Sequence, residues 1–550
     1  MRPRPAASAL SVTIAILIGG TLPLLAYGPR ILDPGDIGWM LAGPLGPDPV
    51  AYWIAWTYFR SAPWLVPPGL NPDWGLELGS SIFYADVIPL LAFLLKALRG
   101  VVAVEQYWGA WLVVCGALQA AAAWALLGRA TEDPVVRGAG AVVFVAQPMM
   151  LNRMGGHFAL AAHWLLVAAL ALALRPPPAR AVQAPGWAGL LAVAALVQSY
   201  LLAMVAALWA ADLIDRLRRD RRLAWTAVEA ALVIGVTLAA LWAAGFFVLR
   251  GAPSPIGEGY GMTALDLLAP FDAAEWGRFL PELPTLRHWE HGGSYLGLGA
   301  LLLLGAAAVA AISGPFSLPF PLGRHAVLML ALLGLLAFAV GNRPALAGTI
   351  LFEIPLPEPV RQLADLLRAS ERFVWPLSYA ALFAAVAVVS ARWRGRTAAA
   401  ILLLAAPVQL ADVSVGLERL RGLVAEAPRE PLPRLADPFW QEAAERYARL
   451  RAVPAENLGA HWEPLARLAA AHRLATDAVY LARVDRRAVE RLRAEMAERL
   501  GAGRYEEATF YVLRDADTLA LARAALDPTR DLLGRFDGID VLAPGWFLPR

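Results

Sequence analysis

The feature that most constrains this chain is a series of long segments with almost no charged residues. These apolar runs are residues 9–27, 107–127, 157–174, 223–249, 295–313, 325–340, 373–391 and 397–411. Several of them reach the roughly 18–20 residues that a helix needs to cross the hydrocarbon core of a bilayer. Charged residues make up 17% of the chain, whereas soluble proteins have about a quarter. The sequence therefore predicts a mainly α, polytopic transmembrane bundle and excludes an ordinary water-soluble enzyme.

Positively charged residues predict how the spans are oriented. Cytoplasmic loops carry an excess of arginine, and the basic stretches are Arg2/Arg4, residues 216–222 and residues 392–396. We therefore expect a cytoplasmic N-terminus and an uncleaved first span, because many spans follow it. The same rule explains the net charge of +3 without a nucleic-acid partner. Outer loops are expected at residues 28–82, 250–294 and 342–371.

Two stretches leave the topology open. Either residues 83–102 and 187–213 each cross the membrane, or 83–102 is an interfacial helix and 187–213 is a shallow hairpin that turns at residues 198–200. We prefer the second arrangement because it keeps every basic loop inside. It also lets the amine of Lys96, the only lysine in the chain, reach water. Both arrangements give about eleven spans and place the C-terminus outside.

The apolar runs stop after about Asp412, and we expect a transmembrane domain at 1–412 and a soluble α/β domain at 413–550. Helical periodicity predicts helices at 437–452, 462–473 and 485–500, and short β-like segments predict strands at 477–483, 508–513 and 539–543. This domain has no Gly-rich phosphate loop, no His/Cys metal spacing and no nucleophile elbow. A binding or lid domain is the interpretation that remains.

The first outer loop is long, and loops of this length are usually functional. Asp48 begins an amphipathic, Trp-rich stretch that suits the membrane interface and would hold its carboxylate at the lipid boundary. The alternative is structural, because an aspartate followed by proline, here Pro49, is typical of a helix N-terminus.

Several further stretches support a family resemblance. They are Asn152 to His157 with His163-Trp164, residues 267–271 (LLAPF), residues 295–299 (YLGLG) and residues 368–376 (RASERFVWP). Together with the Asp48 loop they resemble a bacterial multi-spanning family of unknown function related to the GT-C superfamily of membrane glycosyltransferases. The resemblance implies a protein of the bacterial inner membrane with interfacial helices and a periplasmic or extracellular C-terminal domain. It also implies a sugar donor on polyprenyl phosphate, a cell-envelope acceptor (glycan, lipid or protein), and Asp48 as the general base of an inverting transfer.

The candidate substrate-binding residues are Asp86, Arg153, His157, His163, Glu290, Tyr295, Arg368 and Arg372. The alternatives are Asp86 as the cap of a helix starting at Val87, the arginines and His157 as headgroup anchors, His163 as a packing residue, and residues 290–293 before Tyr295 as an ordinary Gly-rich turn before a helix. GT-C enzymes commonly have an acidic residue in the second outer loop, where this chain has Arg153 and histidines. The sequence therefore indicates no clear binding site for a divalent cation (Mg²⁺ or Mn²⁺). Gln198 also stands where the family suggests a histidine.

Two other functions remain open at this stage. One is a transporter or flippase of a lipid-linked saccharide, and the other is a non-catalytic GT-C-like scaffold in the envelope. Transporters often contain internal repeats with paired broken helices, and the two halves of this sequence show no such symmetry. The sequence thus favours the enzyme over the transporter.

Overall fold

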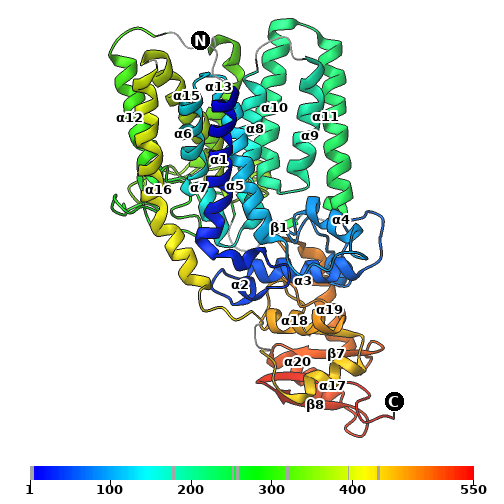
Figure 1. Ribbon diagram of the computed structural model, residues 1–550. Coiled ribbons are helices and arrows are strands. Elements are labelled where there is room, and N and C mark those ends of the chain that lie inside the picture. The colour runs from blue at the N-terminus through cyan, green and yellow to red at the C-terminus, as the bar shows by residue number, and fades with distance from the viewer. Residues whose placement is uncertain are drawn as a thin grey trace. The chain divides into compact units, whose positions relative to one another are not determined.

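The computed structural model describes residues 5–175, 180–249, 253–255, 259–316, 322–393, 395–429 and 434–549. The predictions for Arg2, Arg4 and Arg394 lie outside these residues. The chain forms two compact units that interleave along the sequence. The first, called here the helical unit, comprises residues 1–36, 106–240 and 258–427, and the second, the mixed unit, comprises residues 37–105, 241–257 and 428–550. Helices and strands carry the labels of Figure 1.

The helical unit consists of helices joined by short 3₁₀ turns. Its helices are α1 (Pro5–Tyr27), α5 (Trp108–Leu127), α6 (Pro134–Val145), α7 (Pro148–Leu151), α8 (Trp164–Ala173), α9 (Arg180–Ala195), α10 (Ser199–Asp220), most of α11 (Leu223–Ala244), α12 (Leu298–Ile312), α13 (Ala326–Val340), α14 (Glu358–Asp365), α15 (Trp375–Arg392) and α16 (Arg396–Val424). A two-stranded hairpin, β2 (Ala345–Leu346) and β3 (Thr349–Ile350), precedes α14. Each apolar run predicted from the sequence falls on one of these helices or on the turn that leads into it.

Several of these helices are long and apolar enough to cross a membrane. Among the described residues, six segments qualify: Ala6–Tyr27, Trp108–Leu127, Leu223–Ala244, Gly323–Val340, Ser370–Arg392 and Arg396–Val424. The pair Pro134–Val145 and Pro148–Gly155, bent by 45°, makes a seventh if it is one span. The chain is therefore a multi-pass membrane protein. The predicted total of about eleven spans is not confirmed by these described segments.

Close helix packing in the helical unit uses glycine. A side chain on Gly19 of α1 would overlap the carbonyl oxygen of Gly116 in α5, and a side chain on Gly116 would overlap that of Gly19. Small residues let helix backbones approach closely, which is how helices associate in lipid without a hydrophobic driving force between them. The two glycines thus fix the crossing of α1 and α5.

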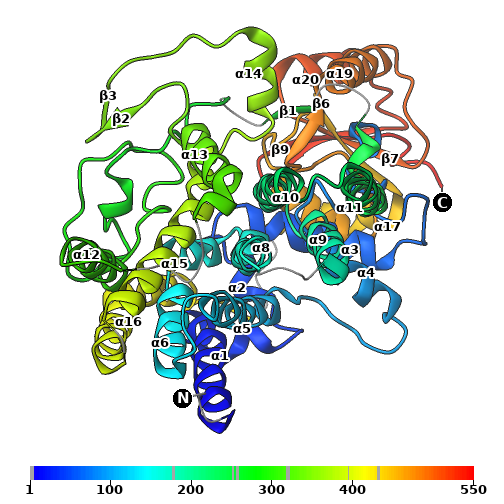
Figure 2. The same cartoon turned by 90° about the horizontal axis from the view of Figure 1, so that it is seen from above.

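The break between α9 and α10 lies at the turn that the sequence predicted. Gln198 caps α10, and its side-chain oxygen accepts the backbone N–H of Tyr200 at 2.6 Å. The two helices run side by side (Figure 2). However, α10 continues for 22 residues to Asp220, a length of about 33 Å at 1.5 Å per residue. Helix α10, the second arm of the predicted hairpin, is therefore longer than the shallow arm that we expected.

The mixed unit contains a five-stranded sheet. Its strand order is β5-β4-β7-β9-β8, with β4 parallel to β5 and β7 and with β9 antiparallel to both β7 and β8. These strands are β4 (Arg449–Val453), β5 (Ala475–Thr476), β7 (Thr509–Leu513), β8 (Leu532–Phe536) and β9 (Ile539–Ala543). The remaining elements are α2 (Gly38–Leu41), α3 (Asp48–Ser61), α4 (Pro89–Ala97), α17 (Pro438–Arg446), α18 (Trp462–His472), α19 (Arg486–Gly501), α20 (Ala516–Ala524), β1 (Pro253–Pro255) and β6 (Arg483–Asp485).

The C-terminal secondary structure was predicted in part. The strands at 508–513 and 539–543 and the helices at 462–473 and 485–500 are confirmed within two residues. The helix predicted at 437–452 ends at Arg446, and the buried residues that follow form β4 in the middle of the sheet. The predicted strand at 477–483 is wrong, since only Arg483 of that range lies in a strand. In both segments, contacts with strands from other parts of the sequence outweighed the local preference for helix or strand.

Most of the predicted first outer loop, residues 37–82, is a structural part of the mixed unit. The backbone N–H of Gly75 donates to the carbonyl oxygen of Thr476, and that of Thr476 to the carbonyl oxygen of Asp73, both at 2.8 Å. The buried Arg451 of β4 binds Glu77 of the loop at 2.6 Å, together with Glu506 at 3.0 Å and Asp477 at 3.3 Å. The observed units therefore differ from the contiguous domains predicted with a boundary at residue 412, and α16 itself continues to Val424.

Helix α4 corresponds to the interfacial helix predicted at 83–102, but it has only nine residues. Lys96 does not extend to water as predicted, because its residue is 1% exposed. Its amine lies 3.9 Å from the ring centre of Phe59 and 4.7 Å from that of Trp64, and it donates to the carbonyl oxygen of Pro63 at 3.2 Å. The two aromatic faces and the carbonyl replace the water that the ammonium would otherwise bind.

This environment predicts an unusual titration for Lys96. Burial, and to a smaller extent the charge of Arg99, lowers the pKa of the amine from 10.5 to about 8. Because Lys96 is the only lysine, selective ¹⁵N or ¹³C labelling of lysine gives one side-chain signal, which should titrate near pH 8. The unfolded chain keeps this proton to higher pH, so the stability of the fold should rise between about pH 8 and 10.5. Lys96→Met should abolish that rise in stability. A titration midpoint of the lysine signal near 10.5 would contradict the prediction.

Candidate functional site

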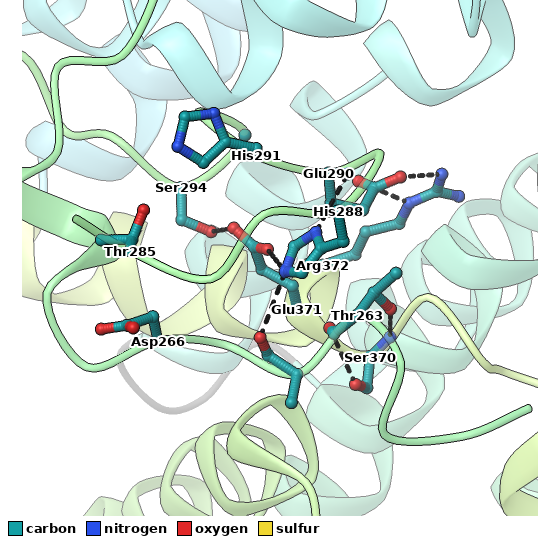
Figure 3. A network of polar contacts seen from close by, with 12 residues as sticks. Thr263, Asp266, Thr285, His288, Glu290, His291, Ser294, Ser370, Glu371 and Arg372 are labelled. Carbon is teal, nitrogen blue, oxygen red and sulfur yellow. Dashed lines mark hydrogen bonds and ion pairs between the residues drawn. The ribbon is translucent and has the colours of Figure 1, made fainter. Parts of the chain in front are cut away.

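The most heavily charged buried group in the helical unit is one carboxylate shared by two arginines. Arg153 lies in the 3₁₀ turn η3 (Asn152–Gly155), Arg372 lies in η8 (Ser370–Val374), and Glu290 lies in the loop before α12. Nη1 of Arg153 donates to Oε2 of Glu290 at 2.9 Å, and Arg372 donates to both carboxylate oxygens at 2.6 and 3.1 Å. Figure 3 shows Glu290 and Arg372 facing each other. We call Arg153, Glu290 and Arg372 the Glu290 cluster.

All three predicted residues of this cluster are thus brought together by segments far apart in the sequence. Their side chains are only 2–7% exposed. Burial raises the pKa of the Glu290 carboxyl, but the attraction of Arg153 and Arg372 outweighs burial and lowers that pKa well below its usual range. Two cations share one anion, and Nε of Arg153 has no acceptor within the described parts of the chain. The Glu290 cluster therefore carries an excess of positive charge.

A second buried carboxylate, Glu371, lies next to the Glu290 cluster. Ser294 donates to Oε1 of Glu371 at 2.5 Å, and Nε2 of His288 is 3.2 Å from Oε2 (Figure 3). The backbone N–H of Glu290 donates to Nδ1 of His288 at 3.1 Å, so in the neutral ring the proton lies on Nε2, which donates to the carbonyl oxygen of Ala264 at 3.3 Å. Burial lowers the pKa of His288, which favours this neutral form.

The sequence analysis missed Glu371 and His288. A signal was present, because Glu371 lies within the candidate span Ser370–Arg392, and an ionisable residue in a span is a functional candidate by default. His288 carries no comparable signal, since its sequence neighbourhood is an ordinary polar loop.

His163 is linked to the Glu290 cluster through an aromatic ring. Its ring centre is 4.3 Å from that of Trp375, and the guanidinium carbon of Arg153 lies 5.6 Å from the same Trp375. Nδ1 of His163 is 3.0 Å from the hydroxyl of Tyr379, and its Nε2 is buried without a partner in the described chain. His163 therefore packs against the cluster without binding to its carboxylate.

Tyr295 has a structural partner. Its hydroxyl donates to Oδ2 of Asp412 at 2.7 Å, and the same oxygen accepts the backbone N–H of Leu298 at 2.8 Å. The other oxygen of Asp412 accepts the backbone N–H groups of Arg278 and Phe279 at 3.0 and 3.3 Å. Tyr295 thus helps to fasten the start of α12 and the preceding loop to α16.

Two predicted cationic residues lie half-buried near the same loop. The guanidinium carbon of Arg368 is 4.7 Å from the ring centre of Trp289, the residue before Glu290. Arg368 and Arg372 therefore contact consecutive residues of one loop, Arg368 from a half-exposed position and Arg372 through its ion pair with Glu290. His157 is also half-buried, and its charge contributes to the lowered pKa of Glu290.

Asp48 lies in the mixed unit, where it is the first residue of α3. Its carboxylate is half-buried, and Oδ1 accepts the hydroxyl of Tyr480 at 3.3 Å. No side chain caps α3 among the described residues, so Asp48 is not engaged in the capping that was the alternative interpretation. Its second oxygen has no hydrogen-bond donor in the described chain and can accept a proton from a ligand.

A cavity of about 390 Å³ lies in the mixed unit near Tyr480. The ring of Tyr480 packs against Trp462 with ring centres 5.5 Å apart, and Trp462 lines the cavity. The other lining residues are Arg434, Leu435, His461, Glu463, Pro464, Asp537 and Ile539. Aromatic, carboxylate and cationic groups therefore meet at one opening, a composition that suits a polar ligand.

The capping role considered for Asp86 is wrong. Asp86 has a positive φ of 51°, and α4 begins at Pro89 with Ile88 as its N-terminal cap. The helix does not start at Val87 because Ile88 has a left-handed backbone, with φ 55° and ψ 74°, and regular helix begins only after it. Asp86 is half-buried in the mixed unit, the same unit as Asp48.

The sequence matches one protein family over most of its length. Residues 16–414 match the domain of unknown function DUF6311, and residues 439–544 match the DUF6311 C-terminal domain. The chain belongs to the DUF6311 family. This confirms the predicted membership of a multi-spanning family of unknown function.

Other comparisons of this DUF6311 protein gave weaker likenesses. No curated protein sequence matches it. Its structure is similar to that of ArnT from Cupriavidus metallidurans in the apo state, with 12% identity, 97% of each chain covered and a TM-score of 0.46. The structure of ArnT from Cupriavidus metallidurans bound to undecaprenyl phosphate is similar at 11% identity, 97% coverage of each chain and a TM-score of 0.44.

Removal of the shared carboxylate should destabilise this DUF6311 protein. Glu290→Gln leaves two buried arginines without their anion. In comparable buried ion pairs such a loss lowers the free energy of unfolding by about 3–5 kcal/mol. The thermal midpoint of the purified protein should fall, whereas Glu282→Gln, at an exposed position in the same loop, should have little effect. The triple variant R153M/E290M/R372M, which removes every charge of the cluster, should recover much of the loss. Equal midpoints for E290Q and E282Q would contradict the prediction.

Proposed function

We propose that this protein transfers a sugar from a polyprenyl-phosphate donor to a cell-envelope acceptor on the outer face of the bacterial inner membrane. The observation that carries this proposal is the carboxylate of Asp48. It begins a helix without capping it, accepts one hydrogen bond from Tyr480, and keeps one oxygen without a protein donor in the described chain. A half-buried carboxylate in this state suits a general base for a hydroxyl group.

The proposed step is a direct displacement. Asp48 removes the proton of the acceptor hydroxyl as its oxygen attacks the anomeric carbon of the donor sugar. The bond from that carbon to the phosphate oxygen breaks, polyprenyl phosphate leaves with the bonding electron pair, and the configuration at the anomeric carbon inverts. No group of three or more metal-ligating side chains is formed by the described residues, so we assign no step to a divalent cation.

The leaving phosphate needs cationic partners. Arg368 is half-exposed and contacts the same loop as the positively charged Glu290 cluster. We assign the phosphate to Arg368, because guanidinium binds phosphate through paired, charge-assisted hydrogen bonds. The Glu290 cluster holds the loop that Arg368 packs against.

The two competing functions differ in what they require of Asp48. A flippase or transporter for a lipid-linked saccharide moves its cargo without proton transfer to a reacting hydroxyl, and a scaffold performs no reaction. In both cases a neutral amide of the same shape at residue 48 should suffice. Only glycosyl transfer requires the basicity of the carboxylate.

Asp48→Asn tests the proposed reaction. The variant keeps the shape of the side chain and an acceptor for Tyr480, so it should fold with an unchanged thermal midpoint. In cells that carry only this variant, polyprenyl-phosphate sugar should accumulate and the envelope glycan product should fall by about 100-fold or more, the range typical of general-base loss. Asp73→Asn, at an exposed position of the same loop, should behave as wild type. A transferring D48N variant would refute the role of Asp48.

Arg368→Gln tests the donor site independently of the reaction. The purified variant should bind undecaprenyl phosphate about tenfold more weakly than wild type, as expected for one lost charge-assisted contact. The matched control is Arg361→Gln, because Arg361 lies on α14 of the same segment but is paired with Glu358 at the surface. Native mass spectrometry of the detergent-solubilised protein measures both affinities. Equal weakening in the two variants would show a general charge effect and no site at Arg368.

A further inference from the structure

A cavity of about 480 Å³ lies in the helical unit, away from the residues assigned above. It is formed where the C-terminal end of α10 meets the start of α13. Its lining residues are Asp215, Arg218, Arg219, Arg221, Gly323 and Arg324. Four arginines and one aspartate therefore surround a space large enough for a phosphate-bearing headgroup.

The single aspartate does not neutralise this cavity. Asp215 is 2% exposed and accepts the backbone N–H groups of Val327 and Leu328 at 3.2 and 3.1 Å, so it caps the start of α13. Its only arginine contact in the described chain is Arg218 at 3.5 Å. The carboxylate is thus occupied by the helix end and fixes the wall of the cavity.

The remaining arginines are available to an anion. Arg219 donates to the carbonyl oxygen of Arg324 at 2.8 Å, which holds the two lining segments together. Neither Arg221 nor Arg324 has a carboxylate within ion-pair distance among the described residues. Three of the four guanidinium groups therefore lack an anionic partner, and they converge from two different segments.

The cavity lies where membrane spans begin. The candidate spans Leu223–Ala244 and Gly323–Val340 start within two residues of its lining. Trp225, in the first turn of α11, is 69% exposed, and tryptophan is enriched at the level of the lipid headgroups. This position favours a lipid over a soluble anion as the occupant.

We propose that this cavity is a binding site for the phosphate headgroup of an anionic membrane phospholipid. Basic pockets between membrane helices bind such headgroups, and guanidinium forms bidentate hydrogen bonds with phosphate oxygens. The positive-inside rule alone explains an excess of arginine here. It does not explain a cavity whose wall is built by a buried helix cap and a hydrogen bond between two segments. The bound lipid would tie the end of α10 to the start of α13.

Lipid binding by the purified full-length protein tests this proposal. The probes are phosphatidylcholine, phosphatidylglycerol and cardiolipin, measured by native mass spectrometry, with inorganic phosphate and pyrophosphate as soluble competitors. The wild type should retain the anionic lipids but not phosphatidylcholine, and the soluble anions should not displace them. The double variant R221Q/R324Q should bind the anionic lipids about tenfold more weakly. Its thermal midpoint in phosphatidylcholine should be unchanged.

A matched control separates a site from diffuse charge. The double variant R222Q/R396Q removes the same number of charges from two basic stretches but leaves the cavity lining intact. It should keep the affinity of the wild type. An equal loss in this control, or equal binding of phosphatidylcholine, would overturn the proposal. Displacement by pyrophosphate with the same dependence on Arg221 and Arg324 would instead show a soluble anion as the ligand and would overturn the lipid assignment.

Discussion

The helical unit depends on buried charge that is balanced locally. Removing a charged group from water is costly, so a buried carboxylate persists only where cations or N–H groups surround it. Glu290 meets this condition through Arg153 and Arg372, and in doing so it joins a loop to two turns of the helical unit. Each of the three side chains would be a buried, unpaired charge without its partners, which is costly in free energy. Their positions relative to one another are therefore fixed.

The same principle organises the irregular backbone between the spans. Backbone N–H groups without helical or strand partners need other acceptors, and in this chain buried carboxylates supply them. Asp266 accepts the N–H groups of Leu268 and Gly348, and Asp272 accepts that of Leu283 together with the hydroxyl of Thr285. The long loop before α12 is therefore held by its own acidic residues. The acidic residues that led us to predict an outer loop here therefore stabilise its backbone.

The mixed unit shows a similar dependence on one buried ion. Arg451 of β4 binds Glu77, Asp477 and Glu506, and these contacts raise its pKa above the ordinary value despite burial. Through Glu77 the predicted first outer loop contacts residues 428–550, the segment that completes the mixed unit. The local environment of Asp48, including the hydroxyl of Tyr480, is consequently built by sequence-distant segments.

Six apolar helices of the described chain that are long enough to cross a membrane, the turn at Gln198 and two strands of the sheet could be predicted from the amino-acid sequence, because hydrophobic length and local capping are properties of neighbouring residues. The sequence also made candidates of Arg153 and Arg372, which lie in stretches that resemble a known family, and of Glu290, which begins a Gly-rich turn before Tyr295. The folded structure was needed to show that Arg153 and Arg372 share the carboxylate of Glu290, that Glu371 and His288 lie beside them, and that Lys96 is enclosed by Phe59 and Trp64. Those outcomes depend on contacts between segments far apart in the chain, and no periodicity or spacing along the sequence encodes which segments meet.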